Sequence, residues 1–273
     1  MLRAVRCLLA GLIWLICAQF ATASPEADTL ARVIRIGEIM AIMCDEGMEY
    51  AGDLNDDMLA GEGGQYWVDR VKRLYDTDRM EATLRKSITD GMDADQIALA
   101  TAYFSSANGK RILTLEISAR TTMFDPEIED IARANYRDLA GSDDTRLAAV
   151  SRFVQTNDLL EMNVAGALTS NYQFYRGLVD GKATNMSDDE ILADVWGQEQ
   201  EIRDDTKGWL YGYLLMAYRP LTEDELEGYI TFSGSPAGRA LNQAMFGGFD
   251  VMFNAISYQL GQSVAQAMKA SDL

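Results

Sequence analysis

The stretch that decides the fold lies near the C-terminus, at Leu221–Leu241, and reads LTEDELEGYITFSGSPAGRAL. A capping residue precedes an apolar run, which leads to an aromatic residue, then Ser-x-x-Gly and a positive charge. Met92–Leu113, MDADQIALATAYFSSANGKRIL, has the same features in the same order. In both stretches Asp or Thr is followed three residues later by Gln or Glu, the spacing of a capping box, which predicts where a helix begins. We therefore expect each stretch to form two helices joined by a short turn.

The two stretches align without gaps at an offset of 129 residues, which pairs Gly109 with Gly238. The same offset pairs Trp67 with Trp196, well outside the motif. Self-similarity at a fixed spacing is the usual signature of a repeated structural unit. The sequence therefore predicts a duplicated helical unit, with repeat 1 over residues 24–141 and repeat 2 over residues 142–273, packed together as one globular unit.

The rest of the chain also reads as helical. Its four prolines each fall where a helix can begin or end, and no stretch shows sustained strand-type alternation. The predicted fold class is an all-α bundle or array of two related helical hairpins, with about nine or ten helices after a signal peptide. In the first helix, Ala41, Cys44 and Met48 are expected on the buried face. Besides the two hairpins, the expected helices span residues 24–52, 65–75, 78–89, 126–139, 143–156, 159–179, 188–218 and 236–268.

The N-terminus has the pattern of a secretory signal. Arg3 and Arg6 precede an uncharged run from Cys7 to Ala18, and residues 21–23 read Ala-Thr-Ala, which a signal peptidase accepts. We expect a signal peptide over residues 1–23 and a periplasmic location. The apolar run is shorter than the roughly 18 residues that a membrane-spanning helix needs, so no stable membrane insertion is expected after cleavage.

Composition excludes several classes of function. The formal net charge is −18, and residues 1–23 carry two arginines and no acidic residue, so the remainder is more acidic still. Nucleic-acid binding depends on Lys and Arg displacing counterions, so no nucleic-acid partner is expected. The chain has no histidine, which removes Ser-His-Asp and Cys-His catalysis and the usual zinc sites. No cofactor, metal site or catalytic residue is predicted.

The repeated Ser-x-x-Gly motif provides one set of ligand-binding candidates. Its serines are expected to cap helices, and its glycines to allow close helix packing, since glycine is otherwise disfavoured there. The alternative is an anion site, because a helix start offers free N–H groups and the adjacent cation opposes the helix dipole. These candidates are Ser106, Gly109, Lys110, Ser235, Gly238 and Arg239.

An aromatic helix provides the second set. Trp209 and Tyr213 share one face of a helix that is apolar all round. Together with residues 171–175 and 245–253 they could line a cavity for an apolar or aromatic ligand, and the alternative is core packing. Gly247 and Gly248, inside an expected helix, predict a kink or a close crossing.

The quoted motif at Leu221–Leu241 resembles the signature of the bacterial family labelled domain of unknown function 2059, an "LT-x-x-EL…F-x-x-S-x-x-G" helical hairpin usually found behind a signal peptide. The resemblance covers about 60 residues of the second half. The first half resembles it as a divergent copy, with Met92-Asp93 for Leu-Thr and Ala107-Asn108 in place of the proline-containing turn. The resemblance implies an exported helical fold and brings no established activity.

The functional expectation is a non-enzymatic binding or scaffolding protein of the cell envelope, whose partner is an unknown envelope protein or a small ligand. One alternative is an envelope hydrolase that uses acidic residues. It requires two carboxylates in one cleft, at least one with a raised pKa. A periplasmic chaperone-like protein with an exposed apolar patch is the other.

Overall fold

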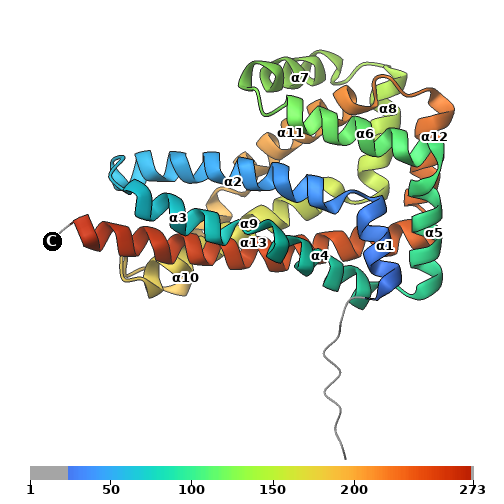
Figure 1. Cartoon of the computed structure of the whole chain (residues 1–273). Coiled ribbons are helices and arrows are strands. Elements are labelled where there is room, and N and C mark those ends of the chain that lie inside the picture. Colours follow the sequence, from blue (N-terminus) through green and yellow to red (C-terminus); the bar gives the residue numbers. More distant parts are fainter. Residues whose placement is uncertain (1–23, 272–273) are drawn as a thin grey trace, which may run out of the picture.

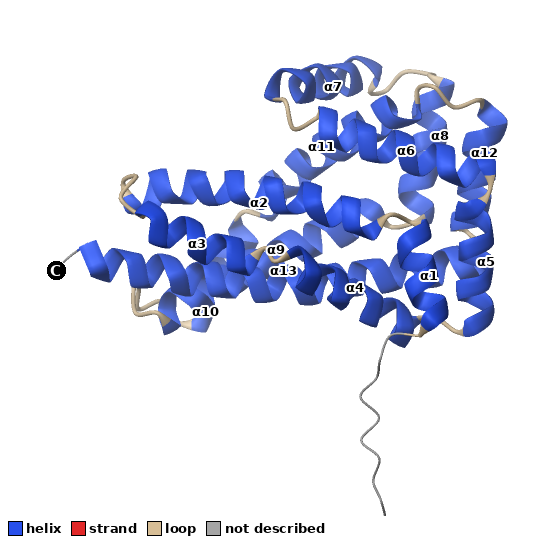
Figure 2. Cartoon of the chain, in the orientation of Figure 1, coloured by secondary structure: helices blue, strands red, loops and turns tan. Residues whose placement is uncertain are grey.

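The chain folds into thirteen helices over residues 24–271, the part that this computed structural model describes, and no strand occurs there (Figure 2). The all-α prediction is confirmed. The predicted signal peptide lies outside the described residues, and within them no helix is long and apolar enough to cross a membrane. The helices are α1 (Pro25–Val33), α2 (Ile36–Leu59), α3 (Gly64–Leu74), α4 (Thr77–Gly91), α5 (Ala94–Ser105), α6 (Ala107–Thr122), α7 (Pro126–Leu139), α8 (Thr145–Thr156), α9 (Leu159–Asp180), α10 (Asp188–Gly197), α11 (Glu199–Tyr218), α12 (Glu223–Ser233) and α13 (Pro236–Ser271).

The count exceeds nine or ten partly because two expected long helices are divided. The one expected over residues 188–218 is divided at Gln198, between α10 and α11. The first is divided at Arg35, whose left-handed backbone (φ 59°) ends α1 and redirects the chain into α2. This conformation is unfavourable for a non-glycine residue. The Arg35 guanidinium donates to both Glu38 carboxylate oxygens, at 2.6 and 2.5 Å.

The break at Arg35 also corrects the predicted buried face of the first helix. In α2 the buried positions include Met40, Met43 and Gly47, whereas Ala41 is exposed and Cys44 is only partly buried. The prediction assumes one continuous helix, and the left-handed residue shifts the buried face of α2 by about one position. The helix also runs on to Leu59, beyond the expected end near Gly52.

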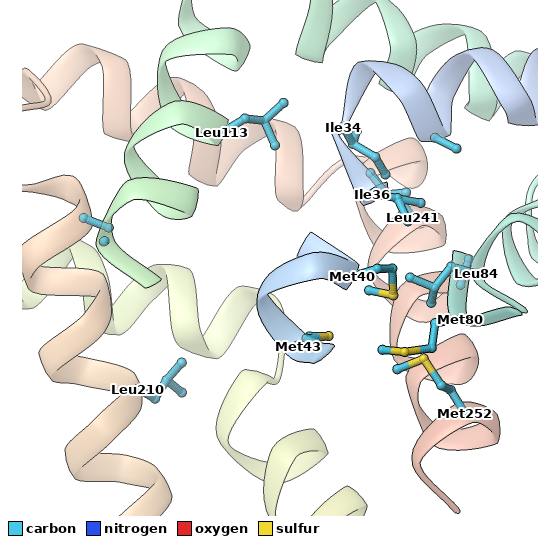
Figure 3. Close-up of a cluster of buried hydrophobic side chains, with 14 of the residues drawn as sticks. Ile34, Ile36, Met40, Met43, Met80, Leu84, Leu113, Leu210, Leu241 and Met252 are labelled. Atoms are coloured by element: carbon cyan, nitrogen blue, oxygen red, sulfur yellow. The ribbon is translucent and has the colours of Figure 1, made fainter. Parts of the chain in front are cut away.

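The 36-residue helix α13 is the longest helix of the described chain, and much of the molecule packs against it. It packs lengthwise against α9 and α4 and crosses α5 near its start, so it touches both predicted repeats (Figure 1). Methionines and leucines fill the space between α2, α4 and α13, where Met40, Met80, Leu84 and Met252 lie together (Figure 3). Helix α11 forms a second centre of packing, against α7, α6 and α9.

Glycines set the closest helix crossings on α13. A Cβ atom on Gly261 would lie 2.1 Å from the carbonyl oxygen of Phe174 in α9, and one on Gly177 equally close to that of Tyr258. Only glycine allows two backbones to approach this far. Gly248 similarly faces Leu84 of α4, which supports the predicted close crossing there. The sequence patterns did not identify Gly177 or Gly261.

The two motifs form closely similar hairpins, α5–α6 and α12–α13. Their helices begin at positions related by the predicted offset, and the aromatic rings of Tyr103 and Phe232 stack on each other at 4.0 Å. The tryptophan pair outside the hairpins differs. Trp67 is 4% exposed and donates to the Ala51 carbonyl, whereas Trp196 is 59% exposed. Duplication of a whole unit, with the boundaries given above, stays a prediction.

Candidate functional site

The two Ser-x-x-Gly helix starts have the same local geometry. Ser106 Oγ accepts a hydrogen bond from the backbone N–H of Gly109, and Ser235 Oγ accepts one from Gly238, each at 3.1 Å. A Cβ on Gly109 would lie 2.3 Å from the carbonyl oxygen of Tyr103, and the corresponding distance at Gly238, to the Phe232 carbonyl, is 2.1 Å. Both glycines are buried. They therefore let the second helix of each hairpin fold back onto the end of the first.

The charged residues beside these glycines are both exposed. The Arg239 guanidinium donates to the carbonyl oxygen of Gly234, at the end of α12. It thereby binds an unsatisfied carbonyl of the preceding helix, a stabilising use of a cation. Lys110 lies at the equivalent place in α6. Since the serine hydroxyls already act as caps, anion binding by these helix starts stays a prediction.

The aromatic residues of α11 line a cavity of about 570 Å³. Its walls come from α2, α5, α6, α8, α9, α11, α12 and α13. Of the predicted ligand-binding residues, it brings together Trp209, Tyr213 and Gly238. The segment 245–253 contributes as predicted, whereas residues 171–175 are not part of the wall.

Aromatic rings dominate this cavity. Trp209 and Tyr213 stack with centroids 5.1 Å apart. Phe153 packs against Tyr229, with ring centroids 4.8 Å apart. Amides and hydroxyls supply isolated polar groups, among them the Asn242 side chain, which donates to the Asn157 carbonyl at 2.9 Å. A largely apolar wall with a few placed polar groups is typical of a small-molecule site.

Glu116 of α6 is the residue that sequence reasoning missed. Its carboxyl group lines the cavity, and the Tyr218 hydroxyl donates to its Oε1 at 2.5 Å. Removal from bulk water raises the pKa of Glu116 from 4.5 to about 7, although hydrogen bonds from Tyr218 and Tyr229 oppose the shift. Glu116 follows the buried Ile112 and Leu113 at helical spacing, so the sequence did carry a signal for its inward position.

Arg120 lies one turn after Glu116 but is engaged elsewhere. Its Nε and Nη2 donate to the two carboxylate oxygens of Glu46, at 2.9 and 2.7 Å, and its guanidinium lies 5.5 Å from the centre of the Trp209 ring. Arg120 and Trp209 also line a second cavity, of about 380 Å³. They therefore form the partition between the apolar cavity and this smaller one, whose other walls include Glu46, Glu49, Glu129 and Asp130.

Asp250 of α13 is the other carboxylate of the apolar cavity. It is exposed at the rim, and partial burial raises its pKa above the ordinary 3.8. Among residues 24–271, no group of three or more acidic or cysteine side chains is arranged to hold a metal ion. Cys44 is a free thiol packed against the core, and burial raises its pKa, which disfavours the reactive thiolate.

The geometry thus provides an aromatic cavity with one partly buried carboxyl group. Comparisons of the chain with protein-family models, with curated proteins and with solved structures find no match. The resemblance to the domain of unknown function 2059 family stays a prediction drawn from the motif.

Proposed function

We propose that this protein is a non-enzymatic binding protein of the cell envelope, and that it holds an apolar small molecule in the cavity beside Glu116. The observation that carries the proposal is the cavity itself, a space of about 570 Å³ between the helices that opens to solvent. A space of this size falls within the range of small-molecule sites.

The character of the wall supports a ligand with a large apolar part. The rings of Trp209, Tyr213, Phe153 and Phe232 provide flat apolar surface on several sides. The envelope location rests on the predicted signal peptide alone.

The test is binding of N-phenyl-1-naphthylamine, an uncharged probe whose fluorescence rises in apolar surroundings. Ala167 of α9 lines the cavity, so Ala167→Trp should fill part of it and weaken probe binding by about tenfold or more. Ala165 lies on the same helix but is exposed, so Ala165→Trp is the matched control and should bind as the wild type does. Absence of probe binding to the wild type, or equal binding by both variants, would contradict the proposal.

A second candidate is a hydrolase that uses carboxylates. One observation favours it: Glu116 and Asp250 line the same cavity, and burial raises the pKa of both. Two acids of different pKa are the working parts of glycoside hydrolases. Turnover of nitrophenyl glycosides that is abolished by both Glu116→Gln and Asp250→Asn would establish this function. Lack of turnover across such substrates would count against it.

A further inference from the structure

We infer that the apolar cavity binds a hydrophobic organic cation, whose positive charge pairs with the carboxylate of Glu116 and whose body lies among the aromatic rings. The inference rests on the proposed binding function and adds the chemical class of the ligand. Three features of the cavity carry it: the neighbours of Glu116, the engagement of Arg120 and the position of the rings.

The neighbours of Glu116 are hydroxyl groups. The Tyr218 hydroxyl donates to Oε1 at 2.5 Å, and the Tyr213 hydroxyl donates to the backbone carbonyl of Glu116 at 3.2 Å. The Tyr229 hydroxyl also lies near enough to lower the pKa of the carboxyl group. The bond from Tyr218 orients the carboxyl group and stabilises its charged form, and all three tyrosines present neutral hydroxyl groups. They bring no positive charge, so a carboxylate here still lacks a compensating cation.

Arg120 does not supply that charge. Among the described residues that line the cavity, it is the one cation, and its guanidinium is held by both carboxylate oxygens of Glu46 and by the face of Trp209. Glu116 and Asp250 are the acidic residues of the wall. With Arg120 balanced by Glu46, the wall carries an excess of negative charge. The net charge of −18 for the whole chain favours approach of a cation in the same way.

The rings complete the site for an organic cation. The faces of tryptophan and tyrosine attract ammonium groups, and aromatic cages are a common solution for quaternary ammonium ligands. Tyr218 bonds Glu116 directly, and the rings of Tyr218 and Tyr229 meet edge to face at 6.1 Å. Trp209 and Tyr213 stack beside them in the wall. Charge pairing and ring contacts are therefore available to one ligand at the same time.

The groups that face Glu116 determine how binding depends on pH. They are Tyr103 from α5, Arg120 from α6, Tyr213 and Tyr218 from α11, Tyr229 from α12 and Asp250 from α13, with Glu46 of α2 behind Arg120. Burial and the charge of Glu116 raise the pKa of the four tyrosines, so they stay neutral between about pH 6 and pH 8. Glu116, with a pKa of about 7, loses its proton over this range. A permanent cation should therefore bind more tightly as the pH rises.

The experiment compares two probes of the same shape, benzyltrimethylammonium and its uncharged carbon counterpart neopentylbenzene, by displacement of N-phenyl-1-naphthylamine from the purified chain. At pH 8 we expect the preference for the cation, as the ratio of the two Kd values, to fall about tenfold in Glu116→Gln. From pH 6 to pH 8 the wild type should gain roughly tenfold in affinity for the cation, and the variant should gain nothing. Glu201→Gln, the same change at an exposed position of α11, is the matched control and should behave as the wild type.

Displacement by neopentylbenzene shows whether the cavity of each variant is intact, since that probe carries no charge. Equal binding of the two probes to the wild type, or a preference for the cation that survives in Glu116→Gln, would overturn the inference and leave the proposed function standing. Failure of N-phenyl-1-naphthylamine to bind at all would instead remove the proposed function.

Discussion

Helices α6 and α13 begin with the same motif and face the same cavity, but they present different chemistry to it. At the predicted offset, Glu116 of α6 corresponds to Met245 of α13, and both line the cavity. Arg120 corresponds in the same way to Phe249. The serine cap and the glycine fix how each helix leaves its turn. The chemistry of the site depends on residues further along, which the shared motif does not contain.

The largest expected effect tests the part that the two hairpins share. In Gly109→Ala and in Gly238→Ala, the added Cβ would lie within 2.3 Å of a carbonyl oxygen of the preceding helix, so the turn has to open. We expect each substitution to lower the free energy of unfolding by about 3 kcal/mol, measured by chemical denaturation.

Gly52 is the matched control for these two substitutions. It lies in α2, and a Cβ added there would have no atom within 4 Å, so Gly52→Ala should raise stability by roughly 0.5–1 kcal/mol. If Gly109→Ala and Gly238→Ala are as stable as Gly52→Ala, close backbone contact does not explain the repeated glycines. A loss of stability at one glycine but not at the other would show that only one of the two hairpins requires glycine at this position.

The second prediction concerns Glu116, the acidic residue that α6 has at the position where α13 has Met245. The pKa of Glu116 is higher in the folded chain, about 7, than its ordinary value of 4.5, so between these values the folded state holds a proton that the unfolded state releases. Stability therefore falls as the pH rises through this window, by about 3 kcal/mol at most. Glu116→Gln lacks this pH dependence. The free energy of unfolding of the variant, relative to that of the wild type, should therefore rise from about pH 4 to pH 8.

Urea denaturation of both proteins at several pH values measures this difference. Glu201→Gln is again the control, since Glu201 is exposed and its substitution should leave the wild-type pH profile unchanged. A constant difference between Glu116→Gln and the wild type across that pH range would mean that the folded chain does not hold a proton on Glu116.

Sequence reasoning succeeds where the controlling interactions are local. The capping boxes at Asp93, Ser187 and Thr222 all form, because each needs only residues three apart. The same locality explains why the role of Gly109 and Gly238 could be predicted. The crossing of Gly177 and Gly261 could not, because these residues meet only through the packing of α9 on α13.

The site itself was only partly predictable, for a related reason. Trp209 and Tyr213 could be identified because an all-apolar helical face is visible in one segment of sequence. Glu116 has its raised pKa because residues of α11 and α12 enclose it, and α6 alone does not show this. Likewise Arg35 gives no sign of its left-handed backbone, since nothing in its side chain favours that conformation.

The smallest expected effect concerns Arg120, which α6 has at the position where α13 has Phe249. Glu46→Gln should leave the Arg120 guanidinium in the cavity wall without its carboxylate, at a cost of about 1–3 kcal/mol in the free energy of unfolding.

Arg152 and Glu227 form the control pair, since both side chains are 56% exposed and water screens their attraction. Glu227→Gln should therefore change stability by less than about 0.5 kcal/mol. Denaturation of both variants in low and in high salt measures the two costs, and the cost of Glu46→Gln should persist in high salt because a partly buried pair is screened less. An equal and small cost at the two sites would mean that the wall does not need Arg120 to be paired, and that this residue is free to turn toward Glu116.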